Sequence, residues 1–167
     1  MAQNATVFKA DINIADMDRC YYATHSLTIA RHPSETDERM MIRILAFAAN
    51  ANEALRFTKG LGTDDEPEIW QKNLVGETLL WVELGLPDEK RIRKACQRAQ
   101  QVVLYCYGGR TAQLWWNGIK NKLDRYHNLR VVNLPEEITE ILAGMAKRTM
   151  TLHFCVEDKQ ISVSNSE

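Results

Sequence analysis

The spacing of apolar residues along the chain predicts strands near both ends and a mixture of helices and strands between them. Residues 5–14 and 20–31 alternate loosely between apolar and polar side chains and are rich in β-formers, which predicts an N-terminal hairpin. An apolar stripe at helical spacing predicts a helix from about Glu35 to Phe57. Residues 149–165 alternate again, so a second hairpin should close the chain.

The stretch from residue 66 to residue 94 is unusual because a carboxylate interrupts an apolar strand. Strand alternation makes both faces of residues 79–84 largely apolar, with Glu83 as the exception. A strand that is apolar on both faces belongs in the middle of a sheet. Glu83 must then be neutral, paired or bound to a cation, because an isolated buried carboxylate is costly.

The elements that follow this strand are typical of a mixed α/β domain. Asp88 should cap a basic helix, and residues 102–108 should form a buried strand parallel to the Glu83 strand, joined to it by a right-handed crossover. The remaining predicted elements are a helix over 111–126, a strand over 128–135 and a helix over 135–148. We therefore expect a mixed sheet flanked by helices, in a single domain over residues 1–167.

Composition and charge narrow the classes of function. A hydrophobic content of 45% and a charged content of 26% are those of an ordinary globular protein, which can bury a substantial core. The net charge of −1 argues against a general nucleic-acid coat protein, although it permits a local basic patch. The cysteines lack zinc-finger or disulfide spacing, and no leader or long apolar run is present. These features predict a cytoplasmic protein that does not enter the membrane.

Two acids on neighbouring predicted strands form a candidate metal-binding site. Glu68 stands at the start of one strand and Glu83 in the next, so a hairpin would hold their carboxylates side by side. Such a pair suits Mg²⁺, which prefers oxygen ligands and needs only one or two protein carboxylates. A metal ion there could activate water and neutralise charge on a phosphodiester. In the helix that follows, Lys90, Lys94 and Arg98 share one face; such a face is most often only solvated, but here it could meet an anion.

These residues resemble a known nuclease signature. Pro67-Glu68 followed by Glu83-Leu84-Gly85 resembles the P-D…(D/E)-x-K pattern of the PD-(D/E)xK superfamily, and the order of elements is similar to its αβββαβ core. A closer resemblance, to the bacterial YaeQ family, covers nearly the whole chain. Four segments carry it: LTIARHPSETDERM, FTKGLGTDDEPEIW, WVELGLPDEKRIRKA and LWWNGIKNKL. This resemblance implies a restriction-endonuclease-like PD-(D/E)xK core with an N-terminal and a C-terminal hairpin.

The resemblance also implies roles for individual residues. Glu68 and Glu83 would take the two acidic positions and hold the metal, with Glu38 as a further ligand or as a solvated side chain. Gly85 stands where the signature has lysine. The role of this missing lysine would pass to Lys94 in the following helix. Lys90, one turn earlier in that helix, is the alternative candidate.

Two functions follow, together with a purely structural alternative. The first is a nuclease that uses Mg²⁺ or Mn²⁺ to hydrolyse DNA or RNA, with Arg91, Arg93 and Arg98 meeting the nucleic-acid backbone. The second is an inactive nuclease fold that binds nucleic acid or a protein partner without cutting. In the structural alternative, Glu83 pairs with an arginine or a lysine inside the sheet.

Overall fold

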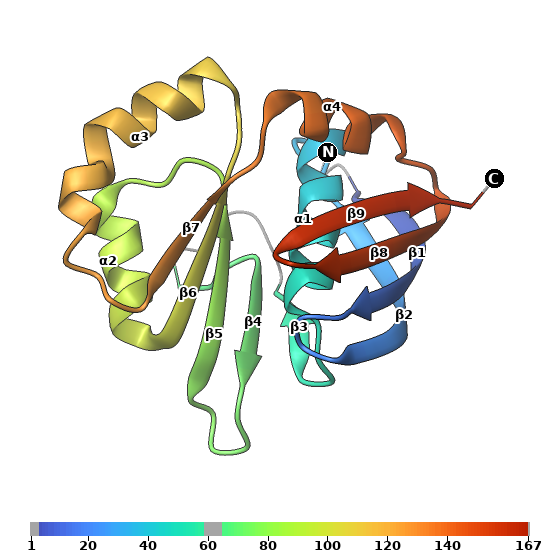
Figure 1. The fold of residues 1–167 in the computed structure, drawn as a ribbon, viewed down its shortest axis with the longest axis horizontal. Coiled ribbons are helices and arrows are strands. Elements are labelled where there is room, and N and C mark those ends of the chain that lie inside the picture. Colours follow the sequence, from blue (N-terminus) through green and yellow to red (C-terminus); the bar gives the residue numbers. More distant parts are fainter. Residues whose placement is uncertain (1–3, 59–64, 167) are drawn as a thin grey trace. The chain divides into compact units, whose positions relative to one another are not determined.

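The computed structural model describes residues 4–58 and 65–166, and its contacts divide the chain into two compact units (Figure 1). The first unit comprises Met1–Asn52 and Glu140–Glu167, and the second comprises Glu53–Thr139. The division falls within helix α4 (Glu136–Gly144). The described residues form two mixed sheets and four helices, which confirms the mixed α/β class. The expectation of a single mixed sheet is wrong, because the two terminal hairpins pair with each other and form a sheet of their own.

The first unit contains a four-stranded sheet in the order β2-β1-β8-β9. Antiparallel pairing of β1 with β2 and of β8 with β9 confirms both predicted terminal hairpins. The two hairpins join through a parallel pairing of β1 with β8. The strands are β1 (Thr6–Asp16), β2 (Tyr21–Arg31), β8 (Thr149–Glu157) and β9 (Gln160–Asn165).

The predicted long helix of the first unit is shorter than expected. Helix α1 spans Asp37–Asn50, with the Thr36 side chain accepting a hydrogen bond from the backbone N–H of Arg39 at its start. The expectation that it continues to Phe57 is wrong, because Leu55–Phe57 forms strand β3. That strand buries Leu55 and exposes Arg56, an alternation that fits a strand edge better than a helix.

The second unit contains a five-stranded sheet in the order β3-β4-β5-β6-β7. Strands β3, β4 and β5 pair antiparallel, whereas β5, β6 and β7 run parallel. The predicted hairpin and the parallel strand after it are therefore confirmed. The strands and the two helices that follow them are β4 (Ile69–Lys72), β5 (Thr78–Leu84), α2 (Glu89–Arg98), β6 (Ala99–Cys106), α3 (Arg110–Leu123) and β7 (Leu129–Asn133).

Apolar packing fixes α2 and α3 on one face of this sheet (Figure 1). Trp81 of β5 packs against Ala95 of α2, together with Ala99 and Val102. A second cluster joins both helices to β6 and consists of Ile92, Leu104, Ile119 and Leu123. Because Trp81 faces α2 and side chains two apart in a strand share a face, Glu83 also lies beneath this helix.

Candidate functional site

Glu83 is a buried acid with a tightly bound partner. Only 4% of the residue is exposed. The Nε of Arg91 donates hydrogen bonds to both carboxylate oxygens of Glu83 at 3.1 Å, and the Nη2 donates to Oε1 at 2.8 Å. The indole N–H of Trp81 donates to the same Oε1 at 2.8 Å. The buried carboxylate that the strand pattern singled out is therefore held in a two-pronged ion pair.

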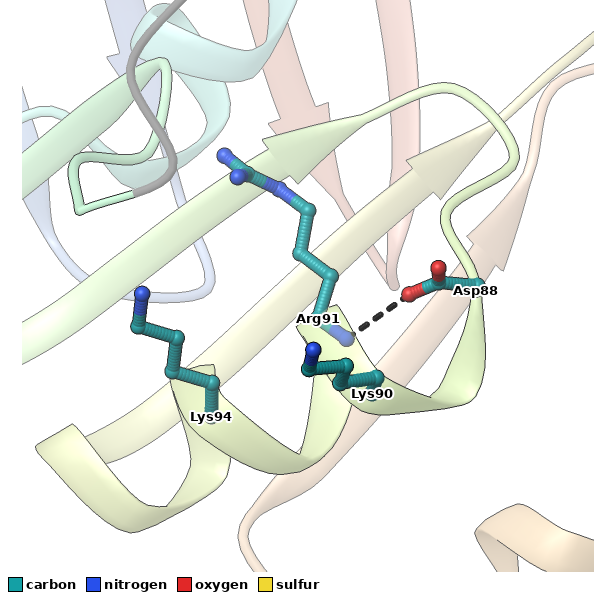
Figure 2. A pocket seen from close by; sticks show the side chains of 4 residues that line it. All are labelled: Asp88, Lys90, Arg91 and Lys94. Carbon is teal, nitrogen blue, oxygen red and sulfur yellow. Dashed lines mark hydrogen bonds between the residues drawn. The ribbon is translucent and has the colours of Figure 1, made fainter.

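Arg91 ties together three parts of the second unit. It lies in the first turn of α2, where the Asp88 side chain accepts a hydrogen bond from the Arg91 backbone N–H at 2.9 Å (Figure 2). Its guanidinium Nη2 also donates to the backbone carbonyl of Glu66 at 3.0 Å. The side chain is 26% exposed, so the guanidinium lies at the boundary between core and solvent. It anchors the helix start to the strand and to the loop before β4.

Glu68 lies close to this pair. It is buried immediately before β4, and its backbone N–H donates to the carbonyl of Val82, the neighbour of Glu83. Burial raises the pKa of Glu83 above its ordinary value, Arg91 and Trp81 act in the opposite direction, and the charge of Glu68 adds a smaller increase. The structure thus brings the carboxyl groups of Glu68 and Glu83 near each other.

Lys94 makes its ion pair elsewhere. Its Nζ lies 2.8 Å from Oδ1 of Asp65, and the Nη1 of Arg98 lies 3.2 Å from the same oxygen. The hydrogen bonds and positive charges of Lys94 and Arg98 lower the pKa of the exposed Asp65 carboxyl. The cation that the structure places on Glu83 is Arg91, one helical turn before Lys94.

The start of α2 lines a pocket of about 360 Å³. Among the described residues, its lining is Asp88, Lys90, Arg91 and Lys94 (Figure 2). Figure 2 shows the side chains of Arg91 and Lys94 extending from successive turns toward the same side of the helix. Three of the four lining side chains are cationic, although Arg91 is paired with Glu83, Lys94 is paired with Asp65, and the capping carboxylate of Asp88 keeps its negative charge. An anion that binds here must compete with Asp65 for Lys94.

The other two predicted residues have no contact with Glu83 among those described above. Arg93 is exposed on α2. Glu38 is half-buried in the first turn of α1 and belongs to the first unit, whereas Glu68 and Glu83 belong to the second.

The residues around Glu83 do not fit a resident Mg²⁺ in this arrangement. The Arg91 guanidinium engages both carboxylate oxygens that would have to face the ion. Over residues 4–58 and 65–166, no group of three or more His, Cys, Asp and Glu side chains is arranged to hold a metal. Gly85 has φ +102°, a conformation that L residues rarely adopt, so lysine at the signature position would strain the backbone.

No helix within the described ranges is long and apolar enough to span a bilayer.

Comparisons with known proteins identify relatives of the whole chain. A family model described as "YaeQ protein" matches residues 1–167. The chain is 48% identical to the "Uncharacterized protein YaeQ" of Escherichia coli (strain K12), over 100% of this chain and 92% of that protein. It is 47% identical to the protein of the same name from Salmonella typhi, over 99% of this chain and 92% of that protein.

Solved structures of the same name have the same fold. The crystal structure of YaeQ protein from Xanthomonas axonopodis pv. citri matches with a TM-score of 0.93 at 46% identity, covering 96% of this chain and 91% of that one. That of YaeQ protein from Pseudomonas syringae matches with a TM-score of 0.92 at 34% identity, covering 96% and 89%. By sequence over its full length and by structure, the chain belongs to the YaeQ family.

Proposed function

We propose that this protein binds the phosphate backbone of a nucleic acid, DNA or RNA, through the cationic face of α2 and does not cleave it. In this proposal the sheet β3–β7 with its helices is a PD-(D/E)xK core that has kept its shape and lost its metal chemistry. We also expect a cytoplasmic location, where both nucleic acids are accessible.

The ion pair between Arg91 and Glu83 carries the proposal. A carboxylate that holds a catalytic metal must present oxygen atoms to it, whereas both oxygens of Glu83 accept hydrogen bonds from Arg91. The acid therefore serves to anchor a basic helix against the sheet. This arrangement favours retention of an anion over hydrolysis of one.

The spacing of cations on α2 supports the same conclusion. Lys90, Lys94 and Arg98 recur every four residues, which is a step of about 6 Å along a helix axis. Lys90 and Arg98 are exposed, and Lys94 keeps 35% of its side chain exposed. A polyanion lying along the helix can meet one cation per turn and release its counterions.

Salt-dependent binding of a short labelled oligonucleotide, measured by fluorescence anisotropy with EDTA present, tests this function. Affinity should fall steeply between about 50 and 200 mM salt. Replacing Lys90 and Lys94 by glutamine should weaken binding and reduce the slope of log K against log salt by about 2. The matched control replaces Lys120 and Lys122, which are exposed in the last turn of α3. Equal weakening in this control would refute the role of α2.

A second candidate is a Mg²⁺- or Mn²⁺-dependent nuclease, favoured by the closeness of the buried Glu68 and Glu83 carboxyls. Metal binding would require the Arg91 guanidinium to withdraw from both oxygens of Glu83. A nuclease should cut single- or double-stranded substrate only with added metal, lose activity on Glu83→Gln, and gain thermal stability with Mg²⁺. Intact substrate and an unchanged Tm would favour the binding function.

A further inference from the structure

A second hollow in the same unit lies beside the last turn of α2, and its lining is aromatic as well as charged. Its volume is about 550 Å³. The described lining includes two tryptophans, two cations, two amides and two acids, which are Trp70, Trp81, Lys72, Arg98, Gln97, Gln100, Asp65 and Glu77. We propose that this hollow binds an unpaired nucleotide, with the base stacked on Trp70 and the phosphate held by Arg98 and Lys72. The inference rests on the proposed function and specifies its ligand.

Trp70 is the aromatic surface that a base would meet. It lies directly opposite Trp81 across the β4–β5 pairing, so both rings belong to one face of the sheet. Trp81 is buried, and its N–H is bound to Glu83. Trp70 keeps part of its surface exposed, and the Nζ of Lys72 lies 4.0 Å from the centre of its ring. Because the ammonium of Lys72 lies over the face of the ring, a base that stacks on this face must take its place, and the displaced ammonium can then contact the phosphate.

Arg98 supplies an anion position at the edge of the hollow. Its Nη1 lies 3.2 Å from Oδ1 of Asp65, and the Nζ of Lys94 lies 2.8 Å from the same oxygen. One carboxylate oxygen between two cations has the arrangement that a phosphate oxygen would take. The Asp65 side chain is 75% exposed, so this contact is weak and a phosphate group can replace it.

Both pockets are lined by residues of α2. Lys94 lines the first pocket and Arg98 the second, and Asp65 joins the two cations. A single strand whose backbone follows Lys90, Lys94 and Arg98 would therefore bring a base to Trp70. The amides of Gln97 and Gln100 provide donors and acceptors for a base edge. A base in a duplex cannot reach the ring, so the ligand must be unpaired.

Three probes test the inference: oligothymidylate, a deoxyribose-phosphate oligomer of equal length without bases, and thymidine monophosphate. Trp70→Ala should weaken oligothymidylate binding about tenfold and leave the baseless oligomer unchanged, because stacking requires a base. Trp70→Phe should retain most of the affinity. The matched control Trp116→Phe changes a half-buried tryptophan of α3 and should bind all probes normally.

The outcomes separate this site from the proposed function. Binding of both oligomers that depends on Lys90 and Lys94 but is indifferent to Trp70 would overturn the base site and leave the function intact. Binding of the monophosphate alone, lost in Trp70→Ala, would support a nucleotide site and refute the nucleic-acid function. No binding of any probe overturns both. If Trp70→Ala fails to fold, Trp70→Leu serves instead and should weaken oligothymidylate and thymidine monophosphate binding about tenfold while leaving the baseless oligomer unchanged.

Discussion

Replacing Arg91 by methionine should destabilise the protein far more than replacing its partner Glu83 by glutamine. Arg91→Met keeps the aliphatic stem but leaves a carboxylate that is only 4% exposed without its cation. Breaking a buried pair in this way costs about 3 kcal/mol. Glu83→Gln leaves a guanidinium that is 26% exposed and still bonded to the Glu66 carbonyl, so about 1 kcal/mol is expected.

The cost of Arg91→Met should grow with pH. The pKa of Glu83 in the folded protein is raised above its ordinary value of 4.5, because burial outweighs the opposing effect of Arg91. Without Arg91 the folded-state pKa rises further. A carboxyl group whose pKa is higher in the folded than in the unfolded protein adds to the free energy of unfolding at pH values below about 4.5. This added stability is lost as pH rises through the folded-state pKa. The variant must then bury an unpaired charge, so the gap from wild type widens above pH 4.5.

Urea unfolding followed by tryptophan fluorescence at about pH 5 and about pH 8 measures both effects. Arg93→Met, an exposed change on the same helix, is the control and should stay within about 0.5 kcal/mol of wild type. The double variant Glu83→Leu with Arg91→Met should recover much of the loss, since an apolar pair can replace a buried ion pair. A cost for Arg91→Met no larger than for Arg93→Met, or equal at the two pH values, would refute the reasoning.

Two further predictions concern the same unit. Gly85→Lys, which restores the signature lysine, should lower stability by about 1 to 3 kcal/mol because the backbone at Gly85 has φ +102°, and a thermal melt measures this loss; an unchanged Tm would contradict the strain. Burial raises the pKa of Cys96 to about 11, so its thiol should react with iodoacetamide more slowly at about pH 8 than the exposed Cys20. Mass spectrometry of partly alkylated protein compares the two, and faster labelling of Cys96 would refute the prediction.

Apolar patterning was sufficient to predict most of the helices and strands, but not their division into two sheets. The alternation in residues 5–14 and 20–31, and again in 149–165, predicted both terminal hairpins, because one face of each strand is buried. The end of α1 was missed because Ala51 and the residues after it have helix-compatible side chains. Strand β3 exists because Leu55–Phe57 finds a partner edge in β4, which local sequence does not encode.

The sequence was sufficient to predict the two acids of the candidate site but not the cation that binds them. The strand pattern singled out Glu83, and the hairpin placed Glu68 beside it. The identity of the cation was not accessible, because Lys90, Arg91 and Lys94 all lie within two turns of the helix start. One signal favours arginine over lysine. The planar guanidinium group of arginine can donate two parallel hydrogen bonds to a carboxylate, whereas the ammonium group of lysine acts as a point charge. The connection between Leu84, the last residue of β5, and the capping residue Asp88 is also short, so the first turn of α2 lies close to the end of β5.

The parallel pairing of β1 with β8 determines the order in which the two sheets can form during synthesis. Lys9 lies opposite Thr149, so the first sheet cannot be completed until the ribosome has released β8. The second sheet uses only the continuous segment Glu53–Thr139, all of which is translated earlier. Contacts of such long sequence separation also form slowly. During synthesis, one edge of β1 therefore stays unpaired until β8 emerges. Because an unpaired strand edge can pair with other chains, the N-terminal hairpin needs protection from aggregation during this interval.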